Sequence, residues 1–303
     1  MSLHDEIRSI AGLELHEDHD LTSYTTMRLK SRGTLVEVAS VAALQKLLPL
    51  LTQHQQRYLV IGWGANQILP SHCDAYVIHL TFPGPESALS TLSESYLLPA
   101  SIGLNLLTAH AVKFNLKGWE VFTGIPASLG GAIYMNAGTN LGEIGKLVKS
   151  VTLVTKKGEI KTVTIHPESF TYRKNHFVKP GDVIVSAELT HLGVDAEIGE
   201  KIKSYLGYRK QTQPLATRNC GCVFKNPQKE IPAGKLIDLI GLKGIALGGL
   251  RISPKHGNFI ENVGDATWEE FQALLSLIQH SMDHFYGIEF ELEVKIPYHE
   301  VCL

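Results

Sequence analysis

The stretch Tyr58-Leu59-Val60-Ile61-Gly62-Trp63-Gly64-Ala65-Asn66 decides which arrangement of helices and strands the chain can adopt. Its first four residues form a continuous apolar run, which predicts a strand that leads directly into two glycines. Residues 76–80 then form a second apolar run, so a strand follows where a helix would be expected. In a Rossmann unit the glycines open a helix and a third glycine is present. The sequence therefore disfavours a nicotinamide-binding Rossmann domain.

The two glycines of this stretch allow two interpretations. Glycine adopts left-handed backbone conformations, so successive N–H groups can point into one concavity and bind a phosphate. The simpler alternative is a tight turn between two strands, and a lone pair of glycines favours that alternative.

A second glycine-rich stretch runs Gly124-Ile125-Pro126-Ala127-Ser128-Leu129-Gly130-Gly131-Ala132-Ile133-Tyr134-Met135-Asn136-Ala137-Gly138. Its small residues let another body approach the backbone closely. Two such stretches suit a long ligand that has a diphosphate and a flat ring, with one stretch for each part. The alternative, that both are merely loops, stays open.

Length and composition indicate a globular protein of two or three domains. The chain has 303 residues, of which 44% are hydrophobic and 19% charged, and its formal net charge is −2. Such a charge gives no basic field for nucleic acid or anionic lipid. We find no apolar run of about 18 residues that would span a bilayer, and no secretory signal at the N-terminus. We therefore expect neither nucleic-acid nor membrane partners, and a cytoplasmic location.

The four cysteines, Cys73, Cys220, Cys222 and Cys302, are too few for a disulfide framework in a chain of this length. The spacing of Cys220 and Cys222 is too tight for a zinc ribbon pair. We expect reduced thiols and no metal site.

The remaining patterns predict an α+β fold. A helix is expected over residues 104–116, with Gly118 as its C-terminal cap, and a β-hairpin over residues 151–163. The capping box Thr267-Trp268-Glu269-Glu270 starts a helix that Gly287 ends. Its apolar face is expected to comprise Phe271, Leu274, Leu275, Ile278, Met282 and Phe285.

Residues 288–296 alternate between apolar and charged side chains, which predicts a strand with one buried face. Glu289, Glu291 and Glu293 would then share the other face. No periodicity distinguishes one of these three glutamates from the others.

Several short motifs occur together along the chain. They are Thr25-Thr26-Met27-Arg28-Leu29, the two glycine stretches, Tyr172-Arg173, Gly221-Cys222-Val223-Phe224-Lys225-Asn226-Pro227, Gly248-Gly249, Ile252-Ser253-Pro254-Lys255-His256 and Glu293-Val294. These motifs have the order and approximate spacing of the motifs in the UDP-N-acetylenolpyruvoylglucosamine reductases. The chain resembles this family over most of its length. Several matches in order are far more specific than any one alone.

The resemblance implies an FAD-binding domain of the vanillyl-alcohol-oxidase (PCMH) type, followed by a C-terminal α+β substrate-binding domain. We expect two FAD-binding subdomains, at residues 1–82 and 83–204, and the substrate domain at residues 205–303. The length suits the shorter form of the family, which lacks an inserted segment. The implied reaction is the FAD-mediated, NADPH-dependent reduction of the enolpyruvyl ether to UDP-N-acetylmuramate, a precursor of peptidoglycan. We expect small-molecule substrates and a monomer.

The resemblance implies that the two glycine stretches bind the flavin. The expected flavin-binding residues are Gly62, Gly64, Ala65, Asn66, Gln67, Gly124, Ile125, Ser128, Gly130, Gly131, Ala132 and Asn136. Two residues depart from the family pattern: Trp63 replaces a usual glycine, and Ala127 stands where Pro-Gly is usual. Each of these residues places a side chain where the family usually has glycine, which has none.

Three residues are expected to be catalytic. Arg173 can hold a carboxylate with its planar fork and stabilise the charge that builds on it, whereas a surface arginine is the alternative. Cys222 occupies the position of the family's proton-donating serine, and its alternative is a buried structural thiol. Glu293 is singled out only by the family register, as a residue that assists protonation or polarises the substrate.

The expected substrate-binding residues are Tyr172, Lys225, Asn226, Lys255 and His256. Solvated surface roles are an equal alternative for Lys255 and His256. Two other functions stay open: a different FAD-dependent oxidase or dehydrogenase on the same fold, and a protein that binds flavin without turnover.

Overall fold

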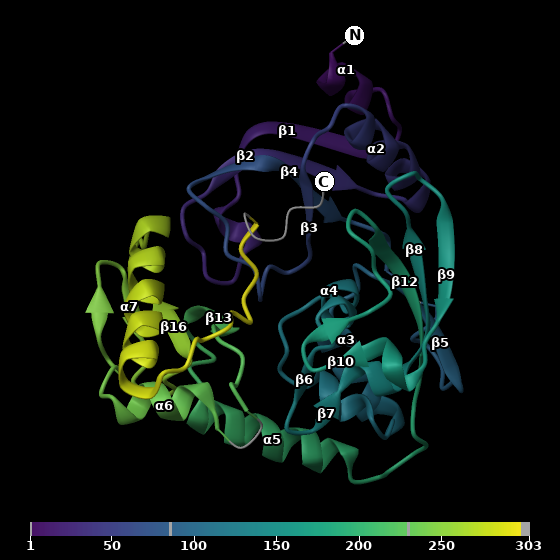
Figure 1. Ribbon diagram of the computed structural model, residues 1–303. Helices are drawn as coiled ribbons and strands as arrows, with labels where there is room; N and C mark the ends of the chain where they lie inside the picture. Colours follow the sequence, from purple (N-terminus) through teal and green to yellow (C-terminus); the bar gives the residue numbers. More distant parts are fainter. Residues whose placement is uncertain (1, 85–86, 229–230, 298–303) are drawn as a thin grey trace.

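The computed structural model describes residues 2–84, 87–228 and 231–297. Three groups of elements surround the middle of the molecule (Figure 1). Two four-stranded sheets come from the N-terminal two thirds of the chain, and a third sheet packs with α7 in the C-terminal part. Cys302 lies outside the described residues. The cysteines Cys73, Cys220 and Cys222 are free thiols, as predicted.

The first sheet has the strand order β1-β2-β4-β3. Its strands are β1 (Leu13–Asp20), β2 (Arg32–Val38), β4 (His72–Leu80) and β3 (Tyr58–Ile61). β3 matches the expected strand, and it runs parallel to β4. The glycines at residues 62–64 therefore begin a connection between two parallel strands without a helix, which is why the Rossmann pattern fails.

Helix α2 (Val41–Gln53) covers one face of this sheet, and α1 (Leu3–Arg8) precedes β1. The Ser40 hydroxyl caps α2 by accepting from the N–H of Ala43, which satisfies one of the free donors of its first turn. Its leucines at positions 44, 47, 48 and 51 are buried against the sheet. The helix continues through Pro49 instead of ending there.

The second sheet has the order β5-β12-β8-β9. It contains β5 (Ser95–Pro99), β12 (Val183–Thr190), β8 (Val148–Val154) and β9 (Ile160–Thr164), and β8 and β9 form the predicted hairpin. Helix α3 (Leu104–Phe114) ends earlier than predicted. Asn115, in the left-handed conformation with φ of 56°, caps it. Gly118 instead precedes a short 3-10 helix, so the prediction that Gly118 caps α3 was wrong.

Short elements complete this half. They are α4 (Leu129–Tyr134), β6 (Gly138–Thr139), β7 (Gly142–Glu143), β10 (Phe170–Thr171), β11 (Lys174–Asn175), and the 3-10 helices η1 (Thr22–Tyr24), η2 (Trp119–Phe122), η3 (Ile144–Leu147) and η4 (Pro167–Ser169). The turn between β10 and β11 consists of Tyr172 and Arg173, so this tight hairpin presents both residues.

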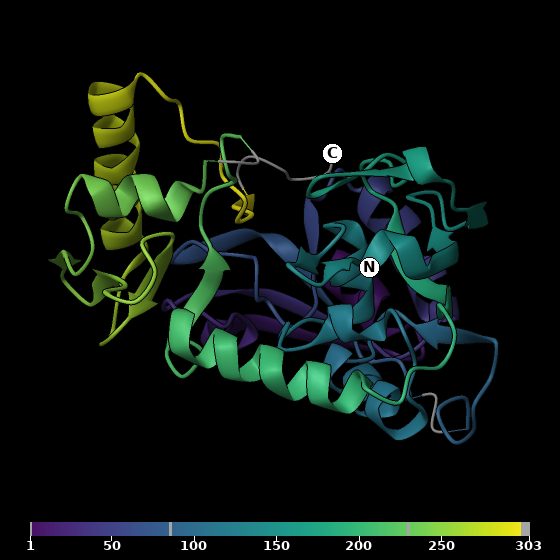
Figure 2. The same cartoon turned by 90° about the horizontal axis from the view of Figure 1, so that it is seen from below.

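Helix α5 (Ile198–Thr212) crosses the molecule from the second sheet to the C-terminal part (Figure 2). That part contains β13 (Arg218–Cys222), α6 (Ala233–Leu239), β14 (Ala246–Leu247), β15 (Leu250–Ile252), β16 (Phe259–Asn262) and α7 (Trp268–Tyr286). Its sheet has the order β13-β16-β15-β14. The capping box of Thr267 and Glu270 starts α7 and Gly287 ends it, as predicted. Phe285, however, is 62% exposed and does not belong to the buried face.

Residues 288–297 follow α7 as an extended segment between the first sheet and β13. Phe290, Val294 and Ile296 are buried, whereas Ile288 and Leu292 are only partly buried, so the predicted alternation holds in part. Glu293 differs from the exposed Glu289 and Glu291, because only 14% of its side chain is exposed. The segment is not a regular strand, because its pairing within the described part of the chain consists of two isolated bridges, of Leu292 with Phe224 and of Lys295 with Gln67. No described helix combines the length and apolarity that crossing a membrane requires.

Candidate active site

A cavity of about 940 Å³ lies between the three groups of elements. Both glycine stretches line it, together with the turn at residues 172–173, the end of β13 at residues 220–222, and Glu293. The volume is near the upper end of the range for cofactor sites. Segments that are far apart in sequence therefore form one site.

The first glycine stretch packs tightly against the N-terminal motif. Gly64 has a φ of 59°, and a Cβ atom at this position would lie 2.0 Å from the backbone oxygen of Tyr24. The N–H of Thr26 donates to the Gly64 carbonyl at 3.2 Å. The N–H groups of residues 63–66 donate to no acceptor among the described residues. This loop consequently offers a row of free donors at the cavity wall.

The second glycine stretch lies directly against the first. A Cβ atom at Gly62 would lie 2.2 Å from the Ser128 Oγ, and one at Gly130 would lie 2.8 Å from the Ala100 Cβ. Asn136 is buried and does not line the cavity. Its side chain donates to Glu143 and to the Thr171 carbonyl, and it accepts from the Gly145 N–H. Asn136 thus holds the second glycine stretch in place through hydrogen bonds, without lining the cavity itself.

Arg173 is held at the cavity wall by three contacts. Its Nε donates to Glu293 Oε1 at 2.7 Å, and a terminal nitrogen donates to the Gly138 carbonyl at 3.2 Å. Its guanidinium carbon lies 4.9 Å from the ring centroid of Tyr172. Arg173 also has a φ of 57°, a conformation that is uncommon for a residue other than glycine. The strained turn and the ion pair together fix the guanidinium group.

Glu293 is fixed through its backbone to both walls. Its N–H donates to the Val223 carbonyl at 2.9 Å, and its carbonyl accepts from Asn66 Nδ2 at 3.0 Å. The Lys295 N–H donates to the Asn66 carbonyl at 2.8 Å. The extended segment thereby joins the first glycine stretch to β13 and places the Glu293 carboxylate between them.

Cys222 ends β13 and is half-buried at the cavity wall. Burial raises the pKa of its thiol to about 12, and the charge of Glu293 acts in the same direction. Burial also raises the pKa of Glu293 above its ordinary value, although Arg173 opposes this shift. At neutral pH the thiol is therefore protonated.

The chain following Cys222 is anchored by Asn258. This buried amide accepts from the Phe224 N–H at 2.9 Å and donates to the Phe224 carbonyl at 2.8 Å. The Asn258 carbonyl accepts from the Val223 N–H at 2.9 Å. A side chain that pairs both groups of one residue fixes the backbone beside the thiol.

Two family profiles match the chain. One is described as FAD binding domain and matches residues 34–164, and the other as UDP-N-acetylenolpyruvoylglucosamine reductase, C-terminal domain, and matches residues 213–297. The UDP-N-acetylenolpyruvoylglucosamine reductase of Chlamydia pneumoniae is 33% identical over 281 residues, which are 92% of this chain and 90% of that protein. The chain belongs to this reductase family. It is therefore an FAD-dependent oxidoreductase.

Other members of the family also match this chain over nearly its whole length. The reductase of Streptococcus uberis is 33% identical over 96% of this chain and 95% of its own length. The crystal structure of the reductase from Thermus caldophilus has a TM-score of 0.77 and 30% identity, and covers 94% of this chain and 98% of its own. The FAD-binding and C-terminal substrate-domain folds predicted from the sequence are confirmed, as is the short form of the family.

The residues around the cavity fit a bound FAD. The free N–H groups of residues 63–66 suit a diphosphate, since backbone donors bind phosphate without a side chain. A Cβ atom at Gly131 would meet only the Ser128 hydroxyl among the described residues, at 3.4 Å, so the second stretch also leaves room. The cavity volume of about 940 Å³ accommodates a dinucleotide.

Neither departure from the family pattern closes the cavity. The Trp63 ring packs over Gly103, where a Cβ atom would lie 2.4 Å from the Trp63 Cζ2, and 41% of Trp63 is exposed. Ala127 forms two backbone hydrogen bonds, from its N–H to the Ile125 carbonyl and from the Leu104 N–H to its own carbonyl. Gly103 thus provides the space that the larger side chain at position 63 needs.

The expected substrate-binding residues occupy different environments. Tyr172, Asn226 and His256 line the cavity, whereas Lys225 and Lys255 do not. The Lys225 ammonium group pairs with Glu291. Lys255 Nζ donates to the Lys210 carbonyl at 3.1 Å.

Two of the lining side chains also have structural partners. The Asn226 side-chain oxygen accepts from the Ala233 N–H at 3.0 Å, at the start of α6. His256 packs against Phe259, and burial lowers the pKa of its imidazole.

Arg209 on α5 lines the cavity and was missed from the sequence. Its guanidinium group donates to the carbonyls of Thr123 and Gly124 at 3.2 and 2.5 Å, and its Nε donates to Gln213. Arg209 therefore connects α5 to the second glycine stretch. No sequence signal separates it from the other basic residues of α5, because the helix buries only Ile198 and Ile202.

Proposed function

We propose that this chain reduces the enolpyruvyl ether of UDP-N-acetylenolpyruvoylglucosamine to give UDP-N-acetylmuramate, with NADPH as the source of electrons. The observation that carries the proposal is the meeting of Arg173, Glu293 and Cys222 on one cavity with both glycine stretches. Another flavin enzyme on this fold would need the glycine stretches but no such set. When bound, FAD supplies the capacity to accept and pass on a hydride.

Arg173 binds the substrate carboxylate in this proposal. Reduction of the vinyl group makes negative charge build toward that carboxylate, and a fixed cation stabilises it. The guanidinium group is already oriented by Glu293 and the Gly138 carbonyl, so little reorganisation is required. Tyr172, stacked on the guanidinium group, and the lining residues Asn226 and His256 bind the rest of the substrate.

Cys222 donates the proton. One vinyl carbon receives hydride, and the neighbouring carbon takes the proton from the Cys222 thiol. The S–H bond breaks as the C–H bond forms, and solvent later returns a proton to the thiolate. A thiol with a pKa of about 12 is fully protonated before each turnover.

Glu293 positions Arg173 in this proposal and raises the proton affinity of Cys222. Its carboxylate lies 2.7 Å from the Arg173 Nε, and its charge raises the pKa of the Cys222 thiol. Lys225 and Lys255, which do not line the cavity, are proposed to act only at its mouth, on the charged part of the substrate.

We also propose that the chain acts as a monomer in the cytoplasm, with the three domain ranges expected from the sequence. The proposed boundary at residues 204 and 205 falls within α5, so this helix would connect the flavin-binding and substrate-binding parts. NADPH and a sugar nucleotide are both metabolites of the cytoplasm.

Anaerobic reoxidation of the reduced flavin tests the proposal. NADPH should bleach the flavin of the purified protein, and addition of UDP-N-acetylenolpyruvoylglucosamine should restore its absorbance in one stoichiometric step. UDP-N-acetylglucosamine, which lacks the vinyl group, is the matched control and should leave the flavin reduced. Failure of the enolpyruvyl compound to reoxidise the flavin would contradict the proposed function, and a protein that NADPH cannot reduce would be a flavin binder without turnover.

A further inference from the structure

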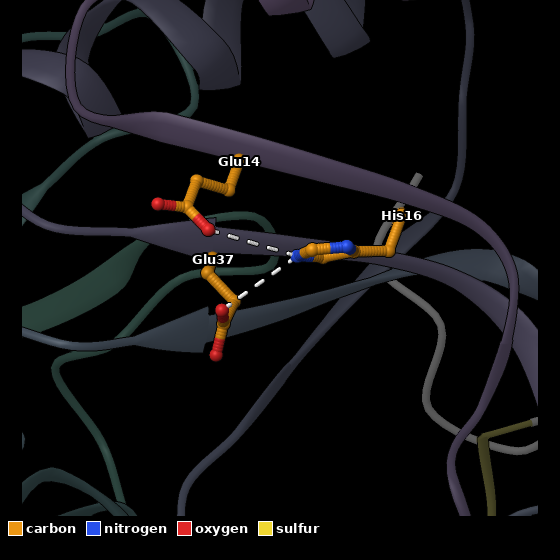
Figure 3. A group of neighbouring side chains, drawn as sticks. All are labelled: Glu14, His16 and Glu37. Carbon is orange, nitrogen blue, oxygen red and sulfur yellow. Dashed lines mark ion pairs between the residues drawn. The ribbon is translucent and has the colours of Figure 1, made fainter.

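A group of side chains on the first sheet lies outside the active site described above. Within the described residues, Glu14, His16 and Glu37 have ligand atoms that all lie within 4.8 Å of one another. Glu14 and His16 come from β1, and Glu37 comes from the neighbouring strand β2. Figure 3 shows the His16 ring pointing toward both glutamates, so that the two ion pairs meet at one imidazole nitrogen.

We propose that Glu14, His16 and Glu37 form a binding site for a divalent first-row transition-metal ion, with Zn²⁺ as the best-fitting member of this class. The sequence did not predict it, because the three residues match no metal-binding spacing along the chain. It arises from strand pairing, which places Glu14 directly opposite Glu37 and leaves His16 two residues further along the same face of β1.

The distances favour a metal over a direct ion pair. His16 Nε2 lies 3.9 Å from Glu14 Oε2 and 3.7 Å from Glu37 Oε2, so neither contact is a hydrogen bond. Two ligands of one tetrahedral zinc ion, each bonded at about 2.1 Å, lie about 3.4 Å apart. The two contacts of His16 therefore have to shorten by only a few tenths of an ångström around an ion, and the ligand oxygens of the two glutamates, which lie within 4.8 Å of each other, have to approach by up to about an ångström.

The charges of Glu14 and Glu37 also favour a bound metal ion. Carboxylates directly opposite each other on neighbouring strands repel, and Glu14 and Glu37 occupy such a pair. Two imidazoles face this pair: His16 contacts both carboxylates, and His79 contacts Glu37. A divalent cation would neutralise both carboxylates and leave His16 free to bind it as the neutral ring.

Glu37 already has the second contact that metal-binding carboxylates usually show. Its Oε1 lies 3.3 Å from His79 Nδ1, while its Oε2 faces His16. His79 is opposite Glu37 on β4, and it lines the active-site cavity. His79 is thus a positioning residue that orients the Glu37 carboxylate. One nitrogen and two carboxylate oxygens suit zinc better than calcium or magnesium, which take oxygen ligands only.

Zinc titration of the flavin-loaded protein, stripped with a chelator, tests this site. We expect one zinc ion per chain, and His16→Ala should weaken binding at least about 100-fold, since it removes the only nitrogen ligand. Glu37→Gln, which keeps the side-chain shape, should weaken it at least about tenfold. His72→Ala is the matched control, because His72 lies on β4 with Asp74 at 3.5 Å and belongs to no group of three possible metal ligands among the described residues, so this variant should bind zinc like the wild type.

A spectroscopic measurement separates this site from background binding by the other histidines, of which the chain has 14 in all. Cu²⁺ bound at one equivalent should give an electron paramagnetic resonance spectrum with coupling to one nitrogen, and this signal should vanish in His16→Ala. Flavin content and the unfolding midpoint of each variant, measured without metal, report that it is folded. Equal zinc affinity of wild type and His16→Ala, or a copper spectrum with several nitrogens that survives the substitution, would overturn the site, as would a wild type that binds no zinc.

Discussion

Arg173 and Glu293 form an ion pair of 2.7 Å although 120 residues separate them in the chain. Only 17% of the Arg173 side chain and 14% of the Glu293 side chain are exposed. Removing one partner of such a pair leaves the other as an uncompensated, largely buried charge. The pair is therefore both a structural clamp across the cavity and the element that fixes the proposed carboxylate-binding group.

The first prediction concerns the proton donor. Cys222→Ala should leave flavin reduction by NADPH largely intact and slow reoxidation by the enolpyruvyl substrate by about 100-fold or more, because a general acid typically contributes that much. Cys222→Ser should keep much of the activity, since a hydroxyl can also donate. Stopped-flow absorbance of the flavin measures the two half-reactions separately, and equal slowing of both would refute the donor role.

The pH dependence of the reoxidation step follows from the Cys222 pKa of about 12. A donor is active while protonated, so its activity is retained below its pKa and lost as the pH rises through it. An unperturbed thiol would titrate near 8.5. We expect reoxidation of the wild type to show no inflection between about pH 8 and 9. An inflection in this range that disappears in Cys222→Ser would contradict the raised pKa.

Glu293→Gln tests the positioning of Arg173. The amide keeps an acceptor for the Arg173 Nε but removes the charge that balances the guanidinium group. We expect reoxidation to slow by about tenfold or more and the KM for the enolpyruvyl substrate to change, because small misplacements of a fixed cation are costly. NADPH-driven reduction should change little. Glu289→Gln, at an exposed position of the same segment, is the control and should behave like the wild type.

Gly64→Ala should weaken both flavin binding and the fold. The new Cβ would lie 2.0 Å from the Tyr24 carbonyl oxygen, and the φ of 59° disfavours any side chain. We expect a loss of about 1–3 kcal/mol in the free energy of unfolding, together with a lower flavin content. Gly84→Ala is the control, because no atom of the described residues lies within 4 Å of its Cβ position. Denaturant unfolding and the ratio of flavin to protein absorbance measure both effects; a Gly64→Ala protein with full flavin content and stability would show that the loop can move.

Local patterns predicted much of the fold. Tyr58–Ile61 is a strand, and the capping box at Thr267 starts α7, because each depends on neighbouring residues alone. The predicted ends and buried faces of helices were wrong where another nearby residue capped the helix first, or where tertiary contacts determined which side chains are buried. Asn115 caps α3 before Gly118 is reached, and Phe285 in the last turn of α7 extends past the core.

The site could be predicted only through the family resemblance. That comparison named Arg173, Cys222 and Glu293, but no periodicity shows that they line one cavity, since they come from a turn, a strand end and an extended segment. The pairing of Lys225 with Glu291 and the contact of Arg209 with Gly124 depend on segments that only the tertiary structure brings together. The same is true of Glu14 opposite Glu37.

The hydrogen bonds that join Glu293 and Lys295 to Asn66 have a consequence for protein synthesis. The first glycine stretch leaves the ribosome long before residue 293, whereas the clamp between Arg173 and Glu293 can form only after residue 293 has been made. Completion of the catalytic centre is thus a late event in the translation of this enzyme.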